Sequence, residues 1–237
     1  MTAKCDGNYP VDNTMFEINL KDVKDQTSEL CLRAVRRDGY NLQDVREQTP
    51  EICLVAVKKY GDALQFVKEQ TPEMCYEAIN QNTYALRYVK EQTPELCLQA
   101  VTANGNTLQF VKEQTPELCL LAVKNYGLAL KYVKEQTLEM CYEAINQNFY
   151  ALQYVKEQTP ELCLQAIKQH AFAIDFVKEQ TLEMCYEAFN QDYHCFRYVR
   201  VQTFEMCLKV VKNDGLALQF VKEQTPELVW KLSNKMA

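Results

Sequence analysis

Apolar residues recur along this chain in two short stripes within every 22 residues, and residues 115–136 give a clear copy. The first stripe consists of Leu118, Cys119, Ala122 and Val123. The second stripe consists of Ala129, Leu130 and Val133. Both stripes have the spacing of a helix with one buried face, so the pattern predicts a longer helix followed by a shorter one.

Local signals place the ends of the first helix. Thr115 can accept an amide hydrogen of the first turn, Pro116 suits the first helical position, and Glu117 complements the positive helix end. Gly127 is expected to end the helix in a left-handed conformation. Other repeats place Asn82, Asn148 or Asp192 one position earlier, and these residues also tolerate positive φ.

The 22-residue period is uninterrupted. Its Gln-Thr pair recurs with threonine at Thr27, Thr49, Thr71, Thr93, Thr115, Thr137, Thr159, Thr181, Thr203 and Thr225. The predicted helices are shorter than the ~12–15 residues that can hold together alone in water, so each repeat must be stabilised by its neighbours. We therefore expect an elongated all-α solenoid of 22-residue helix-turn-helix repeats in a single domain.

Three segments follow from this period. Residues 1–26 form a degenerate amino-terminal capping unit, residues 27–224 form nine full repeats, and residues 225–237 form a carboxy-terminal capping helix. The first and last segments depart from the repeat pattern, as expected for a repeat array, because the outer faces of its terminal repeats must be exposed to water.

Composition narrows the classes of function. The net charge of −6 and the isoelectric point near 5.2 argue against direct nucleic-acid binding. No apolar run suits a membrane span, and polar residues near the start argue against a signal peptide. We expect no membrane association.

Two sequence segments resemble a known family: Ala-Val-Lys-Asn-Tyr-Gly-Leu-Ala-Leu-Lys-Tyr-Val at 122–133 and Ala-Ile-Asn-Gln-Asn-Phe-Tyr-Ala-Leu-Gln-Tyr-Val at 144–155. Residues 27–225 resemble an uncharacterised α-helical repeat family of giant-virus and bacterial proteins. The resemblance implies a helical repeat fold and no particular activity, because the family has no established biochemical role. The strict 22-residue period differs from the longer units of that family.

Nine cysteines occupy one equivalent place on the first stripe: Cys31, Cys53, Cys75, Cys97, Cys119, Cys141, Cys163, Cys185 and Cys207. Stacked helices lie ~8–10 Å apart, which exceeds the ~7 Å between α-carbons that a disulfide allows. We expect buried, free thiols and a reducing, cytoplasmic location.

Polar rows accompany the stripes. A glutamine precedes every threonine from Gln26 to Gln224, and a basic residue stands two positions before each glutamine. These rows have a structural interpretation, in which glutamine binds exposed main-chain groups and glutamate pairs with lysine across repeats. The alternative is that Glu47, Glu69, Glu91 and their equivalents imitate a nucleic-acid backbone and inhibit a DNA-binding enzyme.

Differences between repeats gather in two bands. The outer place of the first helix carries Arg33, Val55, Glu77, Gln99, Leu121, Glu143, Gln165, Glu187 and Lys209. The turn between the helices is rich in tyrosine, asparagine and glycine, a mixture typical of recognition surfaces. It is also compatible with turns that merely tolerate change.

His170 and His194 lie in the turns of adjacent repeats, with Cys195 beside the second. They could hold zinc or form a nucleophilic pair, but no local signature supports either, and ordinary turn residues are the favoured interpretation. We expect no catalytic residue, metal or other cofactor.

The favoured hypothesis is a non-catalytic scaffold that binds a protein partner through its turns and its outer first-helix face. Such a protein could be a viral or bacterial effector that acts by sequestration. The expected aromatic anchors are Tyr84, Tyr150, Phe172 and Tyr193. The residues expected to orient them are Asn82, Asn148 and Asp192.

Overall fold

The structure is a computed structural model that describes residues 19–226 and residue 230. The described residues contain α-helices and 3-10 helices and no strand. The α-helices are α1 (Ser28–Arg37), α2 (Pro50–Lys59), α3 (Pro72–Gln81), α4 (Pro94–Ala103), α5 (Pro116–Asn125), α6 (Leu138–Gln147), α7 (Pro160–Gln169), α8 (Leu182–Gln191) and α9 (Phe204–Asn213). The 3-10 helices are η1 (Leu20–Asp22), η2 (Gly39–Asp44), η3 (Gly61–Phe66), η4 (Thr83–Tyr88), η5 (Gly105–Phe110), η6 (Gly127–Tyr132), η7 (Phe149–Tyr154), η8 (Ala171–Phe176), η9 (Tyr193–Tyr198) and η10 (Gly215–Phe220).

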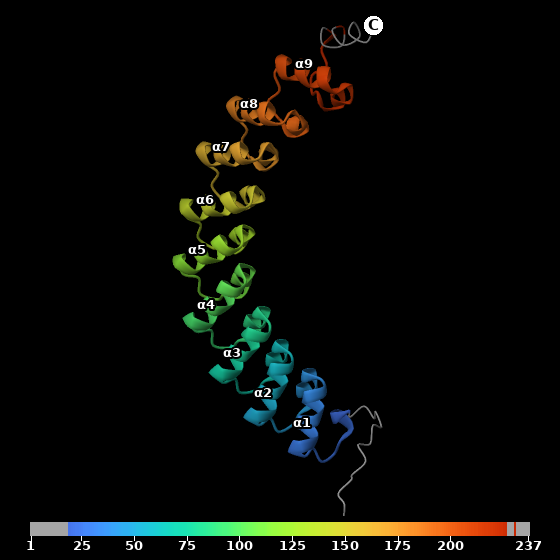
Figure 1. Cartoon of the computed structure of the whole chain (residues 1–237), viewed down its shortest axis with the longest axis vertical. Helices are drawn as coiled ribbons and strands as arrows, with labels where there is room; N and C mark the ends of the chain where they lie inside the picture. Colours follow the sequence, from blue (N-terminus) through green and yellow to red (C-terminus); the bar gives the residue numbers. More distant parts are fainter. Residues whose placement is uncertain (1–18, 227–229, 231–237) are drawn as a thin grey trace, which may run out of the picture. The chain divides into compact units, whose positions relative to one another are not determined.

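These helices form an all-α solenoid, as the period predicts, and each 22-residue repeat supplies one α-helix and one 3-10 helix. The chain divides into two compact units, Met1–Gln81 and Asn82–Ala237. Within the carboxy-terminal unit, α4 to α8 lie side by side in chain order (Figure 1). The second helix of a repeat has six residues, which is about two turns at three residues per turn.

The threonine before each α-helix caps it. The Thr115 hydroxyl accepts a hydrogen bond from the Leu118 amide at 3.3 Å, and Pro116 occupies the first helical position. The pKa of the equivalent first-turn carboxyl Glu95 lies below its ordinary value, because it accepts hydrogen bonds from its own amide and from Thr93. The predicted helix start is therefore confirmed.

The left-handed conformation predicted for the end of the first helix is wrong. No described residue has positive φ, and α5 ends at Asn125 with Tyr126 in extended backbone. Gly127 begins the next 3-10 helix instead. Asn148 and its equivalents also stay extended, and they cap the 3-10 helix that follows.

The glycines allow neighbouring repeats to approach. A Cβ built on Gly105 would lie 2.3 Å from the carbonyl oxygen of Ala122 in the next repeat, well inside van der Waals contact. The corresponding distance is 2.5 Å from Gly39 to Ala56. Close packing between repeats explains these glycines, and a left-handed turn does not.

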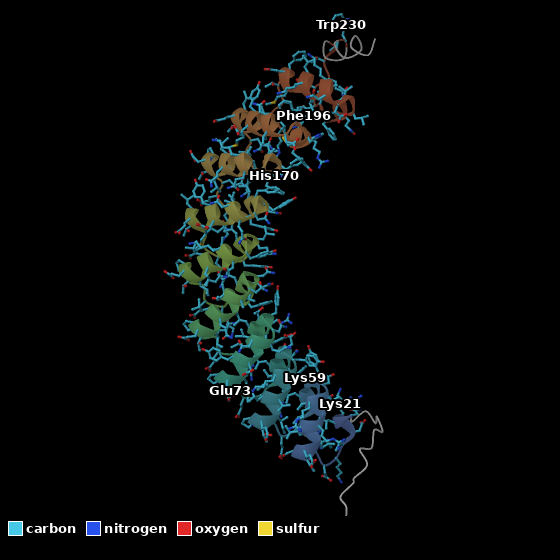
Figure 2. All side chains as sticks on the ribbon, viewed as in Figure 1. Lys21, Lys59, Glu73, His170, Phe196 and Trp230 are labelled. Atoms are coloured by element: carbon cyan, nitrogen blue, oxygen red, sulfur yellow. The ribbon has the colours of Figure 1, made fainter. Side chains whose placement is uncertain are left out.

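The core repeats with the period. Both stripes are buried in residues 115–136, as predicted, and so are most of their equivalents in the other repeats; Leu30, Asn41 and Leu218 near the ends of the array are half-buried. Side chains fill the space between successive helices (Figure 2). Since ten-residue helices are too short to persist alone, burial between repeats stabilises the array.

The two predicted capping segments are described only in part. Residues 1–18 lie outside the described residues, and so do residues 227–229 and 231–237 of the predicted last helix. Leu20 of η1 is buried, and Gln26 donates to the carbonyl oxygens of Leu20 and Asp44. The division at 1–26, 27–224 and 225–237 remains a prediction.

Candidate functional site: the turns and the outer helix faces

The glutamine row clamps successive repeats together. Gln136 donates through Nε2 to the carbonyl oxygens of Leu130 at 3.2 Å and Tyr154 at 2.9 Å, and its Oε1 accepts from the Lys156 amide at 2.9 Å. The same pattern holds at Gln48, Gln92, Gln158 and Gln180. The structural interpretation of the glutamine row is confirmed.

The basic row binds the main chain rather than the acidic row. Lys134 Nζ donates to the carbonyl oxygen of Lys112 at 2.8 Å, and Lys178 Nζ donates to that of Lys156 at 2.8 Å. The ion pairs of Lys21 with Asp44 and of Lys58 with Glu77 involve residues outside these two rows. The same contact to a main-chain carbonyl of the preceding repeat is made by Lys112, Lys134, Lys156, Lys178 and Lys222, so the predicted pairing of stacked glutamates with lysines is wrong at these positions.

The predicted turn residues fall into two registers. Tyr84, Tyr150 and Phe172 occupy the second position of η4, η7 and η8. Tyr193 occupies the first position of η9, where five other repeats have glycine, and its ring centroid lies 4.2 Å from that of His194. Tyr150 is 48% exposed, whereas the other three are half-buried.

The expected orienting residues hold the main chain of the turns. Asn82 Oδ1 accepts from the amide of Tyr84 at 3.0 Å, and Asn148 Oδ1 accepts from that of Tyr150 at 3.0 Å. Asp192 does the same for His194 at 2.9 Å. These caps fix the start of each 3-10 helix and therefore the position of the ring that follows.

Sequence reasoning missed a second aromatic row at the last position of the 3-10 helices. It consists of Phe66, Tyr88, Phe110, Tyr132, Tyr154, Phe176, Tyr198 and Phe220. In the carboxy-terminal unit the Tyr84 ring packs edge-on against Phe110 of the next repeat, with 5.7 Å between centroids. Phe172 packs in the same way against Tyr198 at 6.0 Å. The 22-residue recurrence of an aromatic residue was the signal available in the sequence.

Cations lie over several of these rings. The guanidinium of Arg87 lies 4.7 Å from the centroid of Tyr88, and that of Arg197 lies 4.5 Å from the centroid of Tyr198. The ammonium of Lys131 lies 4.6 Å from the Tyr132 ring. The 3-10 side of the repeats therefore offers aromatic and cationic groups next to each other.

The outer place of the first helix is less free than its variability suggests. Its residues are half-buried except for Arg33 and Lys209. Gln165 donates to Asn146 Oδ1 on the preceding helix at 2.8 Å. Part of this band therefore links neighbouring helices, and only some of its members face solvent.

His170, His194 and Cys195 do not assemble into a reactive group. His170, labelled in Figure 2, accepts the Phe172 amide through Nδ1 at 3.3 Å, and its ring stacks on Phe149. Cys195 is fully buried, and this burial, with the Asp192 carboxylate, raises its pKa to about 12. Among the described residues, no cluster of histidine, cysteine and acidic side chains could hold a metal ion.

The nine equivalent cysteines are free and buried, as predicted. Cys119 Sγ donates to Gln114 Oε1 at 3.5 Å, so the thiols belong to the glutamine clamp. Burial raises the pKa of the Cys163 thiol to about 11. These cysteines are packing groups and have none of the depressed pKa that a nucleophile needs.

Across residues 19–226, no helix combines the length and apolar character that crossing a bilayer requires.

A family model described as a domain of unknown function, DUF4116, matches four overlapping segments: residues 27–71, 49–93, 93–138 and 115–159. Together these segments span residues 27–159, which is more than half of the 237-residue chain. The chain belongs to this family. Each matched segment covers about two of the 22-residue repeats, so the longer family unit corresponds to a pair of repeats here. Comparisons with curated proteins and with solved structures found no match.

Proposed function

We propose that this protein is a non-catalytic repeat scaffold that binds a protein partner through its inter-helix turns and the solvent-facing part of its first helices. Binding through many side chains spread over a repeat surface is a common use of such arrays. The proposal extends to a viral or bacterial effector that sequesters its partner in the cytoplasm, where free thiols persist.

The observation that carries the proposal is the aromatic surface along the 3-10 helices. Half-exposed rings such as Tyr84, Tyr150 and Phe172 stand on capped turns and pack against the second aromatic row. Their positions are therefore set before binding, which lowers the entropy lost on association. Aromatic residues on rigid supports are frequent anchors of protein interfaces.

An acidic mimic of nucleic acid is the competing function. Glu91, Glu113 and Glu135 are exposed, as such a mimic requires, but a lysine precedes each of them in the chain. Because these neighbouring positive charges reduce the field of the carboxylates, we favour aromatic recognition.

Two variants separate these functions. The first replaces Tyr84, Tyr150, Phe172 and Tyr193 by alanine, and the second replaces Glu91, Glu135 and Glu157, which are exposed members of the acidic row, by lysine. Proteins captured from the native cell are compared with those captured by wild type, in ordinary buffer and in ~0.5 M salt, where the screening length falls to ~4–5 Å. The proposal requires a partner that survives the salt, is lost with the aromatic variant and is kept by the lysine variant. The opposite pattern would favour mimicry.

A further inference from the structure

A hollow of about 590 Å³ lies between the amino-terminal halves of α4 and α5, inside the carboxy-terminal unit. Its apolar wall consists of Pro94, Leu98, Leu118 and Leu121. Leu98 is 51% exposed, so folding leaves this surface open to solvent. The volume is within the ~300–1,000 Å³ typical of binding pockets.

The sequence makes this hollow different from its counterparts. The equivalent hollow between α7 and α8 measures about 310 Å³. The residue of α8 equivalent in sequence to Leu121 is Glu187, and the equivalent residue of α6 is Glu143. Among the α-helices of the carboxy-terminal unit, α5 is therefore where this place carries an aliphatic residue, and the hollow beside it is more apolar.

The rim of the hollow is acidic on its solvent side. Glu113 and Glu117 line it and are exposed. Lys112 also lines it, but Lys112 Nζ donates to the carbonyl oxygens of Val89 at 3.4 Å and Lys90 at 2.7 Å. The Lys112 charge reduces the field of the two carboxylates without cancelling it, and its ammonium is held against the main chain, so both carboxylates remain available to a ligand.

We infer that this hollow is the anchor site for a partner segment with a bulky aliphatic or aromatic side chain flanked by lysine or arginine. The inference rests on the proposed function and specifies the chemistry of the partner. The apolar side chain fills the space between Leu98 and Leu121, which removes exposed apolar surface from water. The flanking cations meet Glu113 and Glu117, so charge favours a basic segment over an acidic one.

Selection of random 12-residue peptides displayed on phage tests the inference with the full chain as bait. Leu121→Glu places in the hollow the residue that α6 and α8 carry at the same place, so the fold should tolerate it. Glu187→Leu is the matched variant, because it should create a second apolar hollow beside α8. Binding of selected peptides, labelled with fluorescein, is then measured by fluorescence polarisation.

We expect enriched peptides to share a large apolar residue between basic residues. Leu121→Glu should weaken their binding about tenfold or more, and Glu187→Leu should add a second site. Peptides that ignore Leu121→Glu but depend on Tyr150 would overturn the inference while leaving the proposed function intact. If no selected peptide depends on Leu121, the inference falls.

Discussion

Replacement of Gln136 by methionine removes one clamp between repeats while keeping the length of the side chain. The amide of Lys156 and the carbonyl oxygen of Tyr154 would each lose a partner at 2.9 Å. The Leu130 carbonyl would lose a longer bond, but it also accepts from the Val133 amide. The loss therefore falls mainly on two main-chain groups.

The magnitude follows from these two groups. An unsatisfied buried group costs about 1–3 kcal/mol, and the lower end applies here because Gln136 is only half-buried. The longer Cys141 contact, at 3.9 Å, adds little. We expect Gln136→Met to lower the free energy of unfolding by about 2–3 kcal/mol.

Gln153→Met is the matched control. Gln153 is exposed on η7, and its side chain donates to the Tyr150 carbonyl oxygen at 3.0 Å within the same turn. Its replacement should change stability by less than about 0.5 kcal/mol. Urea unfolding followed by circular dichroism gives both values, and hydrogen exchange should accelerate at the Lys156 amide in the first variant alone. Equal stability losses in the two variants would show that the glutamine row does not hold the repeats together.

Three further outcomes follow from packing and capping. Gly105→Ala should lower the free energy of unfolding in urea by roughly 1–3 kcal/mol, because the new Cβ would lie 2.3 Å from a carbonyl oxygen of the next repeat. Gly215→Ala, whose Cβ would meet nothing within 4 Å, should leave that free energy unchanged or raise it by about 0.4–1 kcal/mol. Equal effects of the two substitutions would reject this role for glycine. Burial raises the pKa of Cys163 to about 11 and that of Cys195 to about 12, so as pH rises these thiols lose their protons in the unfolded chain before they do in the folded chain. Their contribution to the free energy of unfolding should therefore be fully present below pH 9 and be lost between pH 9 and pH 12. A thiol reagent should label both slowly at pH 8 without denaturant, and rapid labelling would contradict their burial. His170→Asn should keep the cap of η8, while His170→Leu should lose about 1 kcal/mol in thermal unfolding; similar melting of the two would exclude a capping role.

The fold was predictable because its determinants are local and repeated. The threonine cap at Thr115, the proline after it and the buried stripe ending at Val123 all depend on spacing along one helix. The glutamine contacts were predictable for a related reason. A polar residue at the same turn of every repeat has unpaired main-chain groups within reach.

The errors concern contacts between repeats, which spacing along one helix does not reveal. Gly127 has the place of a helix terminator, but the closeness of the next repeat determines why glycine stands there. Lysine was expected to pair with glutamate, yet Lys134 reaches a main-chain carbonyl across the repeat boundary. The role of Asn148 likewise depended on how the next helix starts.

The candidate site was predictable only in outline. The turn aromatics could be named from composition, but their support by the second aromatic row required the stacking of repeats. The hollow beside Leu121 could not be foreseen, because its volume depends on how α4 and α5 pack. Membership in a family of unknown function adds no partner.

Photo-crosslinking in the native cell tests partner binding most directly. Benzoylphenylalanine is placed in separate variants at the turn positions Tyr84, Tyr150 and Phe172, and at the acidic positions Glu91 and Glu135 as controls. The account predicts that the turn variants form adducts with one and the same protein, identified by mass spectrometry. Adducts formed only from the acidic positions, with a DNA-binding enzyme as the captured protein, would contradict it.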